Sequence, residues 1–274
     1  MDAIRLLFAL DENYLPQLRV LLTSIAVNNP GECFELYVMH SGLPESGLER
    51  LAEWSAKRGW AFSPVTVDEA LFEGAPVTST YPQEMYYRLL AGGLLPENVD
   101  RVLYLDPDIL VINPLRALWE TDLRGNMFAA AAHTGKTELA NNVNRLRLGT
   151  DHDYYNSGVL LMDLAACRRE ISTGELFDFV RGHRRELVMP DQDLLNAMYG
   201  DRVLPVDDAV WNYDARNYNN YMLRSSGEQN SRWVMQNTSI LHFCGKAKPW
   251  KPNYIYRFGV LYQHYERLAE RDWA

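Results

Sequence analysis

The amino-acid sequence predicts an α/β fold in which a mostly parallel β-sheet is flanked by helices. Short aliphatic runs alternate with longer amphipathic segments along most of the chain, and this alternation is typical of parallel sheets with helical connections. With 274 residues, 47% hydrophobic and 23% charged, the chain can bury one large core. We therefore expect a single domain over residues 1–274, with ligands bound beyond the carboxyl ends of the strands.

The first part of the chain has a clear pattern of strands and helices. Strands are predicted by aliphatic runs at residues 4–10, 34–40, 61–67 and 101–105, of which the third is the weakest and the last the strongest. Helices are predicted by amphipathic segments at residues 15–29, 45–59 and 85–96. The second helix ends at Gly59, a plausible glycine cap, and the third stops at Pro96.

The second part continues the alternation as far as residue 210. Strands are predicted at residues 127–132, 158–164 and 202–206, and helices at 164–183 and 191–200. From about Trp211 the pattern decays into a sequence rich in Asn, Tyr and Ser, with a last helix at 258–271. We expect this tail to wrap around the first part as a lid or as a platform for a substrate.

Composition and charge exclude several classes of protein. The formal net charge of −9 and the absence of a run of Lys or Arg argue against a nucleic-acid partner. The cysteines Cys33, Cys167 and Cys244 have neither metal nor disulfide spacing, which suits a reduced cytosol. The first residues lack the features of a signal peptide, and no apolar run approaches the length of a transmembrane helix. We expect a cytoplasmic protein without a transmembrane segment.

The stretch LYLDPDILVIN, residues 103–113, places two carboxylates and a proline inside an apolar run that should form a buried strand. Burying unpaired charges costs several kcal/mol, so something must compensate for them. Pro107 is expected at a strand end, and side chains at i and i+2 of an extended segment point the same way. Asp106 and Asp108 could therefore converge at the rim of the sheet on a divalent cation such as Mg²⁺ or Mn²⁺. Alternatively, they cap the next turn or pair with Arg.

A second segment, SILHFCGKAKPW at residues 239–250, adds groups of the same chemistry. A neutral imidazole is a good ligand for Mn²⁺ and a poor one for Mg²⁺, so His242 favours manganese. Gly245 lets the backbone approach a phosphate closely, and Lys248 supplies a positive charge for it. Taken singly, His242 could be a structural histidine and the lysines could be solvated. Taken together with the two aspartates, they indicate a site for a metal-bound diphosphate.

Five segments in order make the sequence resemble the retaining glycosyltransferases of family 8. This family includes bacterial lipopolysaccharide galactosyltransferases and glucosyltransferases and the glycogenins. The likeness spans roughly Ile4 to Trp250 and is carried by FALDENY, YYRLLAGGLLP, RVLYLDPDILV, YYNSGVLLMDL, and DQDLLN with HFCGKAKPW. The resemblance implies the GT-A fold, with a Rossmann-like sheet and an Asp-x-Asp metal motif. It also implies transfer of a hexose from UDP-glucose or UDP-galactose to a saccharide or glycolipid acceptor, with Mn²⁺ as the usual cofactor and Mg²⁺ as the alternative. Such reactions build cell-surface polysaccharides.

The resemblance also implies roles for single residues. The metal ligands are Asp106, Asp108 and His242. The nucleotide contacts are Asp11, Asn13, Gly245 and Lys248. The donor-sugar contacts are Arg88, Asn156, Ser157, Asp191 and Gln192, and the catalytic groups among them are Gln192 and Asp191. Residues 1–210 would form the nucleotide-sugar-binding core, and residues 211–274 an acceptor or lid segment that carries the motif from His242 to Trp250.

Other roles stay open for several of these residues. Asp11 and Asn13 could cap the helix that begins at Leu15, and Asp191 could cap its own helix. Arg88 could pair with a surface acid, and Asn156 and Ser157 could be turn residues before a strand. The chain departs from other family members at Pro107 and Ser157, which stand where relatives often carry a small or hydroxylated residue and an alanine, respectively.

The acceptor and the place of action are the least determined. The segment NYDARNYNNY, residues 212–221, has the composition of a sugar-binding loop and equally of a plain polar loop. The tail after Trp250 lacks the basic, aromatic membrane-association segment of some lipopolysaccharide enzymes. Membrane attachment is therefore not implied, while peripheral contact with the inner face of the plasma membrane stays open.

Two other functions compete with transfer. A nucleotidyltransferase would need a glycine-rich, basic loop after the first strand, where this chain has LDENY. A non-catalytic nucleotide or sugar binder would not need the complete set of metal ligands.

Overall fold

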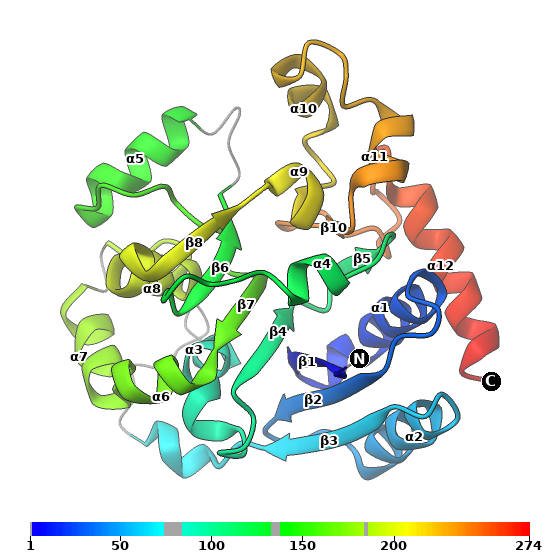
Figure 1. Ribbon diagram of the computed structural model, residues 1–274, viewed down its shortest axis with the longest axis horizontal. Helices are drawn as coiled ribbons and strands as arrows, with labels where there is room; N and C mark the ends of the chain where they lie inside the picture. Colours follow the sequence, from blue (N-terminus) through cyan, green and yellow to red (C-terminus); the bar gives the residue numbers. More distant parts are fainter. Residues whose placement is uncertain (1, 74–83, 133–137, 184–185) are drawn as a thin grey trace.

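The fold is built on a seven-stranded sheet that divides the core into two layers. The computed structural model describes residues 2–73, 84–132, 138–183 and 186–274 (Figure 1). The strand order is β3-β2-β1-β4-β7-β6-β8. These strands are β1 Ile4–Ala9, β2 Phe34–His40, β3 Ala61–Thr66, β4 Arg101–Leu105, β6 Phe128–Ala131, β7 Val159–Asp163 and β8 Val203–Val206.

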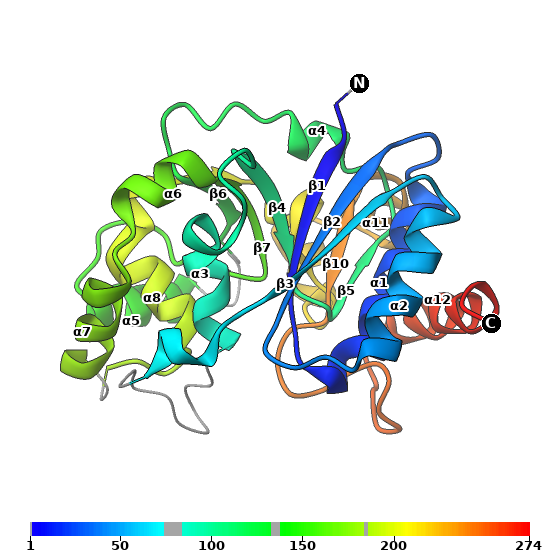
Figure 2. The same ribbon diagram turned by 90° about the horizontal axis from the view of Figure 1, so that it is seen from below.

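Helices cover both faces of this sheet, as the alternating pattern predicted (Figure 2). One apolar layer contains buried residues of α1 Leu15–Asn28, α2 Glu45–Ala56 and α12 Gly259–Asp272. The other layer contains buried residues of α3 Glu84–Leu94, α6 Leu164–Glu170, α7 Thr173–His183 and α8 Pro190–Tyr199. The predicted helical cap is present at Gly59, whose φ is 70°. Pro64 lies in β3, an edge strand, where a residue without an amide hydrogen is tolerated.

One strand of the sheet runs against the others. The pairs of β1 with β2 and β4, of β2 with β3 and of β6 with β8 are parallel, whereas β7 is antiparallel to both β4 and β6. The sheet is therefore mostly parallel, as expected. Because β7 is reversed, its amino end lies at the edge where β1 and β4 have their carboxyl ends. The residues just before β7 consequently reach the side of the sheet where ligands are expected.

The apolar run around Asp106 and Asp108 forms two strands in place of the single strand expected. β4 ends at Leu105 in the large sheet, and β5 Ile109–Val111 belongs to a second, three-stranded sheet of order β5-β10-β9. The other strands of this small sheet are β9 Tyr213–Asp214 and β10 Ile240–His242. The two aspartates thus lie in the turn that passes from one sheet to the other, so that neither charge has to fit inside a strand.

Two further expectations need correction. The helix predicted at 164–183 is two helices, α6 and α7, separated at Ile171 and Ser172. The break follows from Ser172, whose hydroxyl accepts the backbone N–H of Glu175 at 3.4 Å and starts the second helix. The tail from Trp211 onward is also more regular than its composition suggested. It contains α10 Tyr218–Arg224, α11 Ser231–Asn237 and two strands of the small sheet before α12.

The tail wraps around the first part of the chain, as expected. α12 lies along α1 (Figure 1), where Asn28 donates a hydrogen bond to the Tyr265 hydroxyl at 2.7 Å. The rings of Trp54 and Trp273 stack with centroids 4.5 Å apart. Whether the tail also acts as an acceptor or lid segment stays a prediction.

Short elements complete the described part of the chain. They are α4 Arg116–Trp119, α5 Glu138–Leu148 and α9 Asp208–Trp211, with 3-10 turns at Glu12–Tyr14, Glu69–Phe72 and Gly200–Arg202. Within the residues described, no helix is both long and apolar enough to cross a lipid bilayer.

Candidate active site

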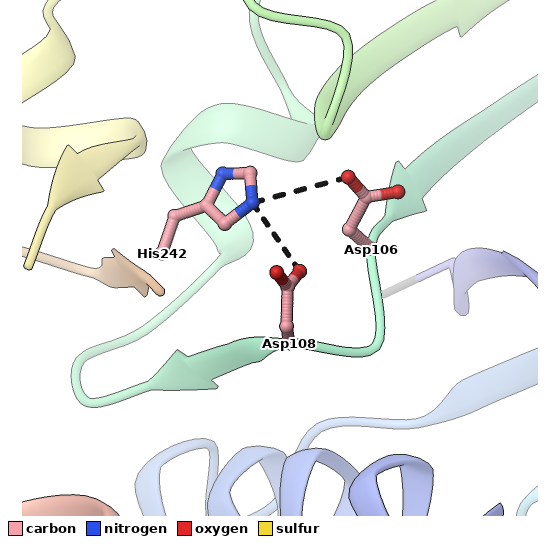
Figure 3. A group of neighbouring side chains, drawn as sticks. All are labelled: Asp106, Asp108 and His242. Atoms are coloured by element: carbon pink, nitrogen blue, oxygen red, sulfur yellow. Dashed lines mark ion pairs between the residues drawn. The ribbon is translucent and has the colours of Figure 1, made fainter. Parts of the chain in front are cut away.

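Asp106, Asp108 and His242 lie together where the two sheets meet (Figure 3). The imidazole Nε2 of His242 is 3.3 Å from Oδ1 of Asp108 and 3.9 Å from Oδ2 of Asp106. Asp106 follows β4, Asp108 precedes β5, and His242 is the last residue of β10. The predicted convergence of these three side chains is confirmed, while their role as metal ligands stays a prediction.

The geometry and chemistry of this group fit a divalent cation. All three potential ligand atoms lie within 4.8 Å of one another. Ligands held about 2.1 Å from an ion in octahedral geometry are about 3 to 4.2 Å apart, which includes both distances to His242. The other ring nitrogen of His242, Nδ1, lies 2.9 Å from the amide oxygen of Asn212. If Nδ1 carries the hydrogen and donates it there, Nε2 offers a lone pair on the side of the carboxylates.

Burial and charge act in opposite directions on the two buried members of the group. Burial disfavours the ionised form of Asp108, but His242 and Lys248 outweigh it and hold the pKa of that carboxyl well below its usual range. Burial also disfavours the protonated form of His242, yet Cys244 and Asp108 raise the pKa of the imidazole well above its usual value. Lys248 forms an ion pair with Asp108 and donates to the backbone oxygen of Phe243 at 2.9 Å. Asp108 is therefore held in its ionised form, with Lys248 as its charged partner.

Arg88 joins this group to the residues predicted to contact the donor sugar. Its guanidinium is buried, lies over the Tyr104 ring, and is 3.1 Å from a carboxylate oxygen of Asp106 and 3.3 Å from one of Asp191. It also donates to the backbone oxygen and the hydroxyl of Ser157, at 2.8 and 3.2 Å. The alternative of a surface ion pair is wrong for Arg88, because its partners belong to the site.

Asn156 and Gln192 are also in contact. The Asn156 amide nitrogen donates to Oε1 of Gln192 at 3.0 Å, and the Ser157 hydroxyl donates to Asp191 at 3.2 Å. Asn156 Oδ1 accepts the backbone N–H of Gly158 at 2.9 Å, which is the bond of an Asx turn. The turn role proposed as an alternative is therefore real, and it coexists with a place in the site.

Three of the four predicted nucleotide residues line a neighbouring surface hollow. This hollow has a volume of about 620 Å³, and its lining includes Asn13, Tyr14, Gly245, Lys246, Lys248 and Trp250. Asp11 does not line it but accepts a hydrogen bond from the Asn13 amide at 3.2 Å. Neither residue caps α1 itself, whose N-cap is Tyr14. Asp11 is instead the N-cap residue of the 3-10 turn Glu12–Tyr14 that leads into α1, without a side-chain cap bond. The capping alternative is wrong for Asp191, since the N-cap of α8 is Met189.

Gly245 occupies a position that only glycine can fill. Its φ is 77°, and a Cβ there would lie 2.3 Å from a guanidinium nitrogen of Arg216. The guanidinium of Arg216 is in turn held by the buried carboxylate of Asp214, at 2.7 and 3.0 Å. The backbone of this loop is therefore fixed from behind by a charged pair.

The sequence did not single out two residues of the site and one acid beside it. Asn212 bonds His242, as described above, and Gly158 lies against the imidazole and Asp106, so that a Cβ there would clash with both. Asp193 is fully buried next to Asp191 and Gln192 in sequence, yet it pairs with Arg147 and turns away from the site. The spacing of Asp191 and Asp193 could have shown that only one of them faces the site, since residues i and i+2 of a helix face different sides. No local signal marks Asn212.

Comparisons with known proteins agree with the observed fold and show the family. Residues 5–253 match the model of glycosyl transferase family 8. General stress protein A of Bacillus subtilis is 30% identical over 263 residues, which cover 93% of this chain and 90% of that protein. Lipopolysaccharide 1,2-glucosyltransferase of Escherichia coli is 25% identical over 253 residues, which cover 89% and 72% of the two chains.

Solved structures give the same result. The galactosyltransferase LgtC, in complex with donor and acceptor sugar analogues, superposes with a TM-score of 0.81 at 25% identity and covers 97% of this chain and 96% of that chain. The fold, a mostly parallel sheet between helices, is thus the GT-A fold of this neighbour. The match of 5–253 covers nearly the whole chain, and the protein therefore belongs to glycosyl transferase family 8.

Proposed function

We propose that the protein is a retaining hexosyltransferase that moves glucose or galactose from a UDP-sugar to a hydroxyl group of a saccharide or glycolipid. The observation that carries this proposal is the continuity of the site. Arg88 contacts both Asp106, in the candidate metal group, and Asp191, in the candidate sugar group. A relative named as a lipopolysaccharide glucosyltransferase and another named as a lipopolysaccharide galactosyltransferase support both hexoses and the type of acceptor.

Asp106, Asp108 and His242 would hold the divalent cation, with Mn²⁺ favoured by the imidazole and Mg²⁺ as the alternative. When bound, the cation supplies positive charge to the diphosphate of the leaving UDP. Lys248 has a long, flexible side chain and would turn from Asp108 to a phosphate oxygen. Gly245 lets the backbone approach that diphosphate, and no proton transfer to the leaving group is required. Asp11 and Asn13 would contact the uridine.

Asp191 and Gln192 would act on the sugar. A sugar that loses its leaving group becomes oxocarbenium-like, so oxygen atoms that carry negative charge stabilise the transition state. Arg88 would hold Asp191 in position, because the guanidinium pairs with it directly. An amide oxygen is a weak nucleophile, so we favour entry of the acceptor on the face that UDP leaves over a covalent intermediate on Gln192.

The acceptor would bind toward the tail, residues 211–274. Within the segment 212–221, residues 212–215 are buried, so only the later part of this segment offers an exposed surface to a sugar. With a glycolipid acceptor, the protein would act in the cytoplasm at the inner face of the plasma membrane, through peripheral contact alone.

The test is release of UDP from UDP-glucose and UDP-galactose in the presence of Mn²⁺, with and without a panel of saccharide acceptors. We expect one donor to be hydrolysed slowly without acceptor and the rate to rise when the correct acceptor is added. Asp108→Asn should abolish the release of UDP that depends on Mn²⁺. Asp178→Asn, at an exposed acid on α7, should leave the rate of release unchanged. Failure to bind UDP, together with no release from either donor, would count decisively against the proposal.

A further inference from the structure

A chain of side-chain amides, which begins at the buried Asn212, connects the candidate metal histidine to the candidate catalytic glutamine. Nδ1 of His242 lies 2.9 Å from Oδ1 of Asn212, and Nδ2 of Asn212 donates to Oδ1 of Asn156 at 2.9 Å. Nδ2 of Asn156 then donates to Oε1 of Gln192 at 3.0 Å. The side chain of Asn212 is inaccessible to solvent, since the residue is 0% exposed. These contacts connect the small sheet to α8.

The direction of this chain follows from chemistry at both ends. A neutral imidazole whose Nε2 faces a cation has its single hydrogen on Nδ1, so its partner must be an acceptor. Asn212 therefore turns its oxygen to His242 and its nitrogen to Asn156. At Asn156 the same direction is fixed independently, because the backbone N–H of Gly158 can only donate and it points at Oδ1. Asn156 is left with its nitrogen toward Gln192.

We infer that Asn212 is a positioning residue for the transfer reaction: it holds His242 with Nε2 toward the two carboxylates and, through Asn156, orients the amide of Gln192. This inference rests on the proposed metal-dependent transfer. It adds that Oε1 of Gln192 is held by a donor, which favours its use as a fixed dipole next to the sugar over its use as a nucleophile. It also predicts that one residue controls metal affinity and turnover by two separable contacts.

The two contacts can be separated by substitution. Asn212→Asp keeps an acceptor for Nδ1, and carboxylates are common partners of metal-bound imidazoles, so Mn²⁺ affinity should stay within about threefold of the wild type. It replaces the donor to Asn156 by a carboxylate oxygen that repels Oδ1 of Asn156. The Asn156 amide should then shift despite its bond to Gly158 and loosen its contact with Gln192, so kcat should fall by about tenfold or more. Asn212→Ala removes both contacts, and Mn²⁺ affinity should fall by about 10- to 100-fold as well.

Two more variants complete the design. Asn156→Ala leaves the bond between Asn212 and His242 intact, so it should keep Mn²⁺ affinity and lose kcat. Asn98→Asp makes the same chemical change at an exposed residue between α3 and β4, outside the site, and should alter neither quantity. Mn²⁺ binding is measured without donor by electron paramagnetic resonance of the free ion, and kcat and KM by UDP release. The melting temperature of each variant is measured in parallel.

The outcomes distinguish this inference from the proposed function. A wild-type protein that takes up no Mn²⁺ overturns the metal on which both depend. A wild type that binds Mn²⁺, with a folded Asn212→Ala variant of equal affinity, overturns the role of Asn212 alone. If Asn212→Ala does not fold, Asn212→Asp decides: full kcat refutes the inference, and retained affinity with reduced kcat supports it.

Discussion

Substitution of Gly158 by alanine tests whether the geometry of the acidic group controls activity. The φ of Gly158 is outside the left-handed region, so the backbone itself accepts an L residue. A Cβ at this position would lie 2.3 Å from Cε1 of His242 and 2.6 Å from Oδ2 of Asp106. Because ordinary contact begins near 3.4 Å, the imidazole or the backbone must move by about 1.1 Å. The added methyl group would thus push His242 and Asp106, which are attached to different sheets, away from position 158.

A displacement of this size is large for a catalytic site. Misplacement by about 1 Å can cost about a hundredfold in rate, or about 2.7 kcal/mol in transition-state stabilisation. We expect kcat/KM of Gly158→Ala for UDP release to fall by about that factor, with Mn²⁺ affinity reduced as well. The assay is donor hydrolysis at saturating and limiting Mn²⁺, combined with direct metal binding.

A matched control is available on α3. A Cβ at Gly93 would meet no atom within 4 Å, so Gly93→Ala makes the same chemical change without a clash. It should keep full activity and gain about 0.4–1 kcal/mol in stability from the restricted unfolded chain. If Gly158→Ala keeps more than half of the wild-type kcat/KM and binds Mn²⁺ normally, the reasoning from geometry is refuted.

Three further predictions concern catalysis, the buried acid and pH. Gln192→Ala should lose about a hundredfold in kcat, as expected for one electrostatic contact; a loss on the order of a millionfold in single-turnover assays would instead identify a nucleophile. Asp193→Ala should lower the free energy of unfolding in urea by about 3–5 kcal/mol, because Arg147 loses a fully buried partner; an unchanged urea midpoint would contradict this. Burial lowers the pKa of His40, whose Nδ1 accepts a backbone N–H at 3.2 Å. As the pH falls, the unfolded chain therefore takes up a proton at His40 before the folded chain does. The neutral His40 side chain thus stabilises the fold fully above about pH 6.5, and this stabilisation is lost as the pH falls. Urea titrations at pH 7.5 and 5.5 should show a smaller pH effect in His40→Asn than in the wild type, and an equal effect would exclude His40 as the source.

The large sheet was predictable because local sequence patterns identify its strands. The runs at 34–40 and 101–105 coincide with β2 and β4, since aliphatic residues between polar boundaries specify a buried strand without reference to the rest of the chain. The convergence of Asp106 and Asp108 was predictable for a similar reason. Their spacing of two and the intervening proline limit the backbone to a strand end.

Of the small sheet, the sequence predicts only the short apolar strand at the start of SILHFCGKAKPW, which is β10; its pairing with β5 and β9 was not predictable from such patterns. β5, β9 and β10 have two or three residues each and pair over long sequence separations, as when Leu110 pairs with Leu241. Runs this short carry no periodicity of their own. The same reason explains why Asn212 was missed. Its importance derives from the pairing of β10 with β9, which carries the imidazole to its amide, and no neighbour in the sequence reveals that pairing.

The division of the acidic group between two sheets makes activity sensitive to distant packing. Asp106 follows β4 of the large sheet, whereas Asp108 precedes β5 and His242 ends β10, both strands of the small sheet. A slight rotation of one sheet relative to the other would move Asp106 away from Asp108 and His242 without breaking any strand. The C-terminal helix α12 contacts both parts: Tyr265 bonds Asn28 of α1, and Tyr262 packs against Phe243, the residue after His242, with ring centroids 5.3 Å apart. Substitutions where α12 packs against the rest of the chain would therefore change the turnover rate, while every residue around the substrates stays the same.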